Sequence, residues 1–147
     1  MNHQEPIQKF IVSPKMLEKL TELGTACTFL KNEVILNDQS NIRSIPIVTK
    51  GSIKVMQKDD DYRELFLYHI QPGETCIMSF LGGLHNERSQ IKAIAETDTE
   101  VLMLPIENAV RLVKEFPEWV DYIFRIYHKR FEELLMVVNE LSFKKID

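Results

Sequence analysis

The chain has 147 residues, a length typical of one domain that buries a core of its own. A hydrophobic share of 44% and a charged share of 27% are those of a globular protein, and a net charge of −4 argues against direct nucleic-acid binding, because such domains are usually basic. The two cysteines lack CxxC spacing, which excludes common zinc-finger and iron–sulfur motifs. With no apolar leader and no membrane-length run, the sequence predicts a cytoplasmic protein without membrane contact.

The first predicted element is a short helix. Ser13 and Pro14 are the residue types of an N-cap and a first helical position, and Gly24 marks the end of the helical pattern. From Cys27 onward, short runs of β-branched and aromatic residues alternate with turn residues, which is typical of an all-β sandwich or roll. The predicted strands are 27–30, 34–36, 44–49, 52–57, 63–70, 75–78, 90–95 and 101–104.

The last third of the chain is predicted to be helical. Pro105 opens a short helix that stops before Pro117, and residues 118–143 contain neither Gly nor Pro. Apolar residues in this long helix alternate at spacings of four and three, a heptad seam formed by Val120, Phe124, Tyr127, Phe131, Leu134, Val138 and Leu141. Because one roll covers only one side of so apolar a helix, we expect a homodimer through this seam. The alternative is a single helix packed only on its own roll.

Several motifs in order carry a family resemblance. They are "FLKNEVILND", "IPIVTKGSIKVMQ", "YRELFLYHIQPGE", "RSQIKAIAETDTEVLMLP" and "LSFKKID". Together they resemble the sensor half of the Crp/Fnr family of bacterial transcription regulators. The resemblance implies a mainly β fold with flanking helices, a double-stranded β-helix (jelly roll) over residues 1–116, and a long dimerisation helix with a hinge over residues 117–147. It also implies a small-molecule effector, and DNA binding only through a helix-turn-helix domain beyond Asp147.

The segment after the fifth predicted strand resembles the ligand loop of that family. In its cyclic-nucleotide binders, a turn glycine precedes a Gly-Glu pair, whose carboxylate binds the ribose, and an Arg-Ser or Arg-Thr pair, which binds the phosphate. The resemblance places the turn at Gly73 and the phosphate-binding pair at Arg88 and Ser89, while the Gly-Glu positions hold Ile77 and Met78. The ribose carboxylate is therefore missing. We expect cyclic AMP to bind weakly or not at all.

The long helix also differs from that of the family members that bind cyclic AMP. Their polar Thr-Ser pair falls at Leu134 and Leu135. The candidate ligand-binding residues are Gly73, Glu74, Met78, Ser79, Phe80, Gly82, Gly83, Arg88, Ser89 and Leu134. An equally weighted alternative for Arg88 is a structural arginine paired with a carboxylate such as Glu87 or Glu74.

Other functional classes find less support in the sequence. Cys76, in the predicted strand 75–78, is expected to be a buried thiol rather than a redox sensor. We expect no enzymatic activity, because nucleophile and phosphate-loop motifs are absent. A cupin-like metal site would need clustered ligands on the strands, and the predicted strands offer only His69. The sequence therefore requires no metal or cofactor. It does not identify the effector. The competing function is a stand-alone jelly-roll domain that binds a metabolite or dimerises without a role at DNA.

Overall fold

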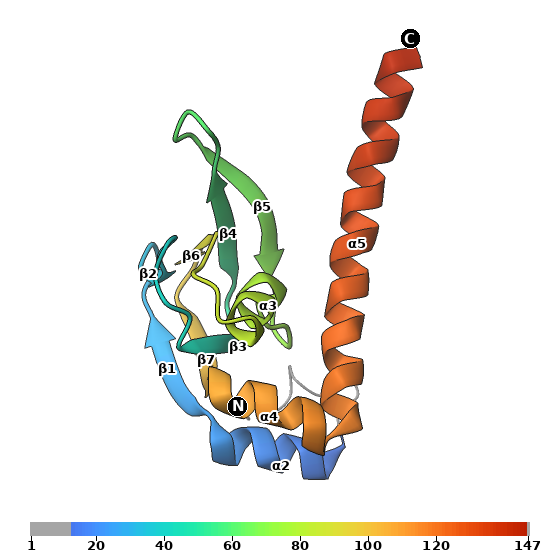
Figure 1. The fold of residues 1–147 in the computed structure, drawn as a ribbon. Helices are drawn as coiled ribbons and strands as arrows, with labels where there is room; N and C mark the ends of the chain where they lie inside the picture. The colour runs from blue at the N-terminus through green and yellow to red at the C-terminus, as the bar shows by residue number, and fades with distance from the viewer. Residues whose placement is uncertain (1–12, 147) are drawn as a thin grey trace.

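The computed structural model describes residues 13–146 (Figure 1). The parts of the predictions that concern residues 1–12 and Asp147 lie outside the described residues. The elements in chain order are α2 (Pro14–Leu23), β1 (Thr25–Phe29), β2 (Val34–Leu36), β3 (Ser44–Lys50), β4 (Ile53–Lys58), β5 (Glu64–Ile70), α3 (Ile77–Leu84), β6 (Lys92–Ala95), β7 (Thr99–Pro105), α4 (Ile106–Glu115) and α5 (Pro117–Ile146).

Two antiparallel sheets form the roll. One has the strand order β1-β7-β3 and the other β2-β6-β4-β5, so strands distant in sequence become neighbours. Alternate side chains of the facing strands fill the space between the sheets, and the buried set there includes Val48, Val55, Ile70, Ile91 and Val101. The predicted fold class, mainly β with flanking helices and a long last helix, is confirmed.

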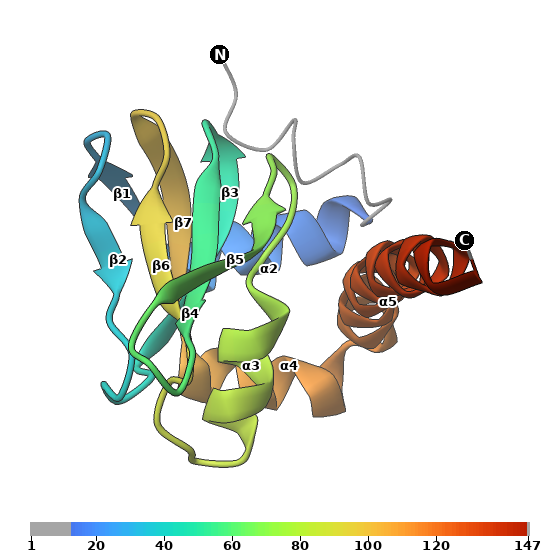
Figure 2. The ribbon, with the colours of Figure 1, turned by 90° about the horizontal axis from the view of Figure 1, so that it is seen from above.

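A second core joins the helices to the roll. α2 and α4 both lie at one end of the sheets, and the start of α5 packs in the same core (Figures 1 and 2). Trp119, at the base of α5, is fully buried; its ring stacks on Tyr122 with centroids 5.3 Å apart and meets Phe80 of α3 edge-on at 6.1 Å. These aromatic contacts fix the direction in which α5 leaves the body of the protein.

The strand predicted at 75–78 is wrong. Thr75 makes only an isolated bridge with Ile47, and the chain enters helix α3 directly after Cys76. A short run of Ile, Met, Phe and Leu is compatible with a buried strand or a buried helix, so its periodicity alone did not separate the two. The burial predicted for Cys76 is confirmed, although the thiol lies at the start of a helix.

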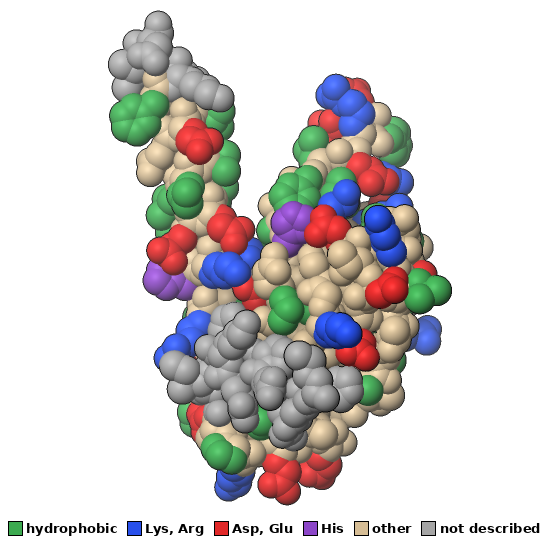
Figure 3. All heavy atoms as spheres, turned by 180° about the vertical axis from the view of Figure 1, so that it is seen from behind, with side chains coloured by type: hydrophobic (Ala, Val, Ile, Leu, Met, Phe, Trp, Pro, Cys, Tyr) green, Lys and Arg blue, Asp and Glu red, His purple; other side chains and the backbone are tan. Residues whose placement is uncertain are grey.

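Beyond its base, α5 projects away from the roll. Its 30 residues correspond to roughly 45 Å at 1.5 Å per residue. The β4–β5 hairpin projects in the same direction, and the space-filling view shows the two as separate projections that carry hydrophobic side chains (Figures 1 and 3). On the hairpin, Leu65, Phe66 and Leu67 are exposed. Within residues 13–146, no helix combines the length and the apolar character needed to cross a bilayer.

We predict that Gly51→Ala destabilises the roll. Gly51 forms the β3–β4 turn at φ +90°, and an added Cβ would lie 2.6 Å from the backbone oxygen of Asp98 and 2.9 Å from the Cα of Thr99. A non-glycine residue in a sparsely populated backbone region costs about 1–3 kcal/mol, and here backbone atoms must also move. Urea unfolding followed by circular dichroism measures the loss.

The matched control is Gly82→Ala in α3. There an added Cβ meets only the terminal methyl of Ile42, at 2.7 Å, and alanine favours the helix. A loss at Gly82 equal to that at Gly51 would contradict the assignment of the cost to the turn.

Candidate functional site

The turn between β5 and α3 is fixed to strand β3. Gly73 has φ 92°, and its N–H donates to the carbonyl of Val48 at 2.7 Å, while the Val48 N–H donates to the carbonyl of Glu74 at 3.0 Å. The Thr75 hydroxyl donates to the carbonyl of Pro46 at 2.7 Å. These hydrogen bonds hold the turn firmly on the roll, directly before α3.

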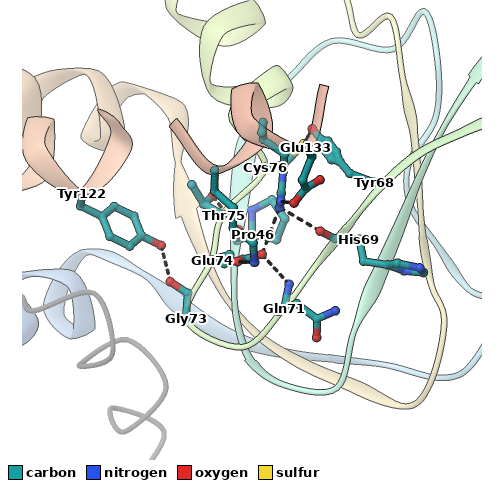
Figure 4. A network of polar contacts seen from close by, with 12 residues as sticks. Pro46, Tyr68, His69, Gln71, Gly73, Glu74, Thr75, Cys76, Tyr122 and Glu133 are labelled. Carbon is teal, nitrogen blue, oxygen red and sulfur yellow. Dashed lines mark hydrogen bonds and ion pairs between the residues drawn. The ribbon is translucent and has the colours of Figure 1, made fainter. Parts of the chain in front are cut away.

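The side chain of Glu74 connects this turn to α5 (Figure 4). It is only 2% exposed, and its Oε1 accepts from the Gln71 N–H at 2.8 Å and from Nη2 of Arg130 at 3.0 Å. Its Oε2 accepts from the ammonium group of Lys129. A buried carboxylate needs such partners because burial removes its hydration. Glu74 therefore holds the middle of α5 against the roll.

Arg130 makes most of the contacts on the α5 side of this connection. Its side chain is 12% exposed, and Nη2 also donates to the carbonyl of His69 at 2.8 Å. Nη1 donates to Glu133 at 3.0 Å, and the guanidinium lies over the ring of Tyr68, 4.3 Å from its centroid. Within the described part of the chain, the buried Nε of Arg130 has no hydrogen-bond partner.

Two buried tyrosines complete the contact region. The Tyr122 hydroxyl donates to the carbonyl of Gly73 at 2.8 Å, two turns of helix below Arg130. The Tyr68 hydroxyl lies 3.4 Å from the sulfur of Cys76, and Ser79 donates to the same sulfur at 3.2 Å. Burial raises the pKa of both phenols above the ordinary range of tyrosine, so both are neutral hydrogen-bonding groups at physiological pH.

Above these contacts a cavity opens between α5, α3 and β5. Its volume is about 390 Å³, within the range of small-molecule sites. The lining residues are Leu67, Tyr68, Ile77, Met78, Leu81, Tyr127, Arg130, Phe131, Glu133, Leu134 and Val137. Most of these side chains are apolar, and the charged groups, Arg130 and Glu133, both come from α5. The lining of the cavity is therefore largely apolar.

A smaller cavity of about 170 Å³ lies at the other end of α3, beside Arg88. Arg88 is exposed, and its Nη1 donates to the carbonyl of Gln39 at 3.0 Å. Among residues 13–146 it pairs with neither Glu87 nor Glu74, so its structural partner is a backbone carbonyl and not the carboxylate suggested from sequence. The hydroxyl of Ser89 is buried and bonds with the backbone of Ile91.

The structure separates the sequence-predicted ligand residues into groups. Met78 and Leu134 line the large cavity; Met78, Gly82 and Arg88 line the small one. The others are buried or belong to backbone structure: Gly73, Glu74, Ser79, Phe80, Gly83 and Ser89. Phe80 belongs to the core, and a Cβ on Gly83 would meet Ile106 at 2.4 Å. Their roles in ligand binding stay predictions.

Sequence reasoning missed Arg130 and Tyr68. A signal for Arg130 was present, because Tyr122, Ile126 and Arg130 follow at four-residue intervals and therefore share one side of the helix. A charged residue on the buried side of a helix predicts a buried partner. The partner, Glu74, is 56 residues away in the sequence, and no local pattern indicates it.

The predicted dimer seam runs along the exposed surface of α5, and three of its members, Tyr127, Phe131 and Leu134, also line the cavity beside α3 and β5. Val120 is partly buried, and the other members are exposed: Phe124, Tyr127, Phe131, Leu134, Val138 and Leu141. A row of large apolar side chains without cover is unusual on a monomer. Within the described residues, no group of three or more His, Cys, Asp or Glu side chains is arranged to hold a metal ion.

Fold and site together define a β-roll domain with a cavity against its last helix. A family model described as "Cyclic nucleotide-binding domain" matches residues 26–116, which is more than half of the chain, and the chain belongs to this family. No curated protein sequence matches the chain.

Solved structures share the fold. The chain is similar to the catabolite activator protein of Thermus thermophilus, with 20% identity and a TM-score of 0.73 over 94% of this chain and 63% of that one. It is similar to the c-di-GMP responsive global regulator CLP of Xanthomonas campestris, with 17% identity and a TM-score of 0.76 over 89% of this chain and 65% of that one. A CooA mutant from Carboxydothermus hydrogenoformans shares 19% identity, with a TM-score of 0.69 over 93% and 85%.

These similarities confirm the resemblance to the sensor half of Crp/Fnr regulators at the level of the fold. The chain spans 63% of the Thermus protein and 65% of CLP. Any activity at DNA, effector or assembly is therefore a matter of proposal for this chain.

We predict that Glu74→Gln lowers the free energy of unfolding by about 1.5–3 kcal/mol, the range for hydrogen bonds to charged groups. The change keeps the shape of the side chain but leaves Arg130 without its buried counter-charge. Denaturant unfolding measures the loss. The control is Glu132→Gln, whose side chain is 66% exposed and pairs with His128 on the same helix, so we expect little change. Equal effects in both variants would contradict a structural role for the Glu74 contact.

Proposed function

We propose that the chain is the effector-sensing and dimerisation part of a Crp/Fnr-like bacterial transcription regulator that acts in the cytoplasm. The observation that carries the proposal is the cavity between the roll and α5, because a molecule bound there touches both parts at once. The similar proteins include a catabolite activator protein and a global regulator. A stand-alone metabolite-binding or dimerisation domain with the same cavity is the alternative.

In this proposal α5 carries the signal. Its base is fixed by the core around Trp119, and its middle by Glu74. Its distal half is exposed on the outer side and lies against the cavity on the inner side. An effector that fills the cavity changes the packing of this half and, with it, the orientation of whatever follows α5. The change is a shift between two packings of a helix pair.

The proposed effector is not cyclic AMP. A cyclic phosphate at Arg88 would leave the ribose beside Ile77 and Met78, which offer no carboxylate for its hydroxyl. On α5 the purine would meet Leu134 in place of a polar side chain. Buried polar groups of the nucleotide would then lack partners, which costs about 1–3 kcal/mol for each group.

Dimerisation through α5 is supported by the row of exposed apolar side chains along that helix. Burial of a large aliphatic or aromatic side chain contributes about 1.5–3 kcal/mol, so covering the exposed seam gives a second copy a strong driving force. The heptad spacing allows the two helices to keep their seams in contact over several turns.

We predict that the chain is a dimer and that Val138→Glu makes it a monomer. Each dimer would lose two valine contacts and place two like charges in the seam, a weakening of about 3 kcal/mol or more. Val138 does not line the cavity, so the change leaves the ligand site in place. Light scattering over a concentration series measures the mass. The control is Asn139→Glu, an exposed position beside the seam. A wild-type chain that stays monomeric at high concentration would rule out the dimer.

We predict that cyclic AMP and cyclic GMP produce little or no shift in the melting temperature. The physical reason is the missing ribose carboxylate and the leucine on α5. A thermal-shift titration measures this, with Arg88→Ala in parallel. A large shift in the wild type that Arg88→Ala abolishes would show that Arg88 binds the phosphate and that our exclusion of cyclic nucleotides is wrong.

A further inference from the structure

The two charged side chains at the cavity differ in how far they are exposed to solvent. The Arg130 side chain is 12% exposed, whereas that of its partner Glu133 is 44% exposed. Nη2 of Arg130 is held by the His69 carbonyl and by Glu74, which fixes the guanidinium at the cavity wall. Among the described residues, the partner of Nη1 is Glu133, three residues further along the same helix. The cation is built into the site, and the anion at its edge reaches solvent.

We propose that this cavity binds an apolar monocarboxylate, an acyl or aryl acid, whose carboxylate takes the place of Glu133 on Nη1 of Arg130. The inference rests on the proposed function, since it names the chemical class of the effector. Glu133 turns to solvent when the ligand binds, which is inexpensive for a half-exposed carboxylate on a helix surface. The ligand carboxylate gains a charge-assisted bond to a pre-positioned guanidinium.

The apolar part of the ligand follows from the other walls. Three elements contribute apolar side chains to the cavity: Leu67 from β5, Ile77, Met78 and Leu81 from α3, and Phe131, Leu134 and Val137 from α5. Among the described wall residues, Arg130, Glu133, Tyr68 and Tyr127 carry polar side chains, and the Tyr127 side chain is half exposed. The Tyr68 hydroxyl already contacts Cys76. A ligand with several polar groups along its body would leave most of them unpaired, so the wall favours a hydrocarbon or aromatic body.

The two ends of such a ligand also explain how it could act. Its carboxylate contacts α5 through Arg130, and its body contacts α3 and β5. Burial of apolar surface on all three elements would strengthen the packing of the distal half of α5 on the roll. The expected effect of the ligand is therefore a more firmly held α5.

The test uses decanoate, below its micelle-forming concentration, and decan-1-ol, which has the same chain without the charge. Isothermal titration calorimetry on the chain of residues 1–147 measures both. We expect decanoate to bind at least about tenfold more tightly than decanol, because a hydrogen bond to a charged group is stronger than a neutral one. A parallel titration with 4-phenylbutyrate tests an aryl body.

Variants locate the headgroup. Arg130→Met is expected to weaken decanoate about tenfold or more and to leave decanol nearly unchanged. Glu133→Gln removes the competing carboxylate and is expected to strengthen decanoate several-fold, again without effect on decanol. The matched control is Arg125→Met, an arginine of the same helix that pairs with Asp121 outside this cavity, and it should change neither affinity.

Arg130→Met also removes the buried counter-charge of Glu74, which destabilises the folded chain. The double variant Glu74→Gln/Arg130→Met removes both charges and is less disruptive than the loss of one. Glu133→Gln keeps Arg130 and its Glu74 contact intact and gives an independent result.

Three outcomes would overturn the proposal: decanol binding as tightly as decanoate, weaker decanoate binding in Glu133→Gln, or no binding of decanoate and 4-phenylbutyrate. None of these outcomes touches the proposed dimerisation, which is tested separately by the mass of the chain and by Val138→Glu. Loss of the dimer with retained decanoate binding would instead leave the ligand class intact and contradict the dimerisation role.

Discussion

The contact between Glu74 and α5 is the interaction on which the site depends. A carboxylate that is 2% exposed requires compensation, and Arg130 and Lys129 supply it from the middle of the long helix. Ion pairs of this kind are weak contributors to net stability but strict in geometry, since loss of one partner leaves a buried charge. Glu74 therefore determines where α5 lies relative to the roll and, with it, whether a cavity exists between them.

α5 has to satisfy different surroundings along its length. Its base is a core element, with Trp119, Tyr122 and Ile126 fully enclosed. Its distal half has one side against a cavity and the other side exposed. The base therefore remains fixed while the distal half has room for more than one packing. That combination of a fixed end and an adjustable end is what a helix needs to transmit occupancy of a nearby cavity.

The chain keeps the family's fold while its ligand chemistry differs. The loop retains an arginine at the position expected for phosphate binding, but Arg88 bonds to a backbone carbonyl beside a cavity of about 170 Å³. The larger cavity is at the other end of α3, where Met78 and Leu134 contribute apolar surface. Leucine and methionine in place of polar groups change which ligand is favoured without altering the backbone, because hydrophobic burial makes no demand on geometry comparable to that of hydrogen bonds.

The sequence by itself determined the elements whose signals are local. Ser13, Pro14 and Gly24 mark the first helix, alternating β-branched residues mark the strands, and the absence of Gly and Pro marks α5. At residues 75–78 the local signal was compatible with a strand or a helix. In the structure the chain there enters helix α3, which packs on Trp119 and Ile106. The pairing of Glu74 with Arg130 joins residues 56 positions apart, and only the tertiary structure could decide it. The cavity followed from that pairing, because a pocket is defined by the distance between elements and no single element encodes that distance.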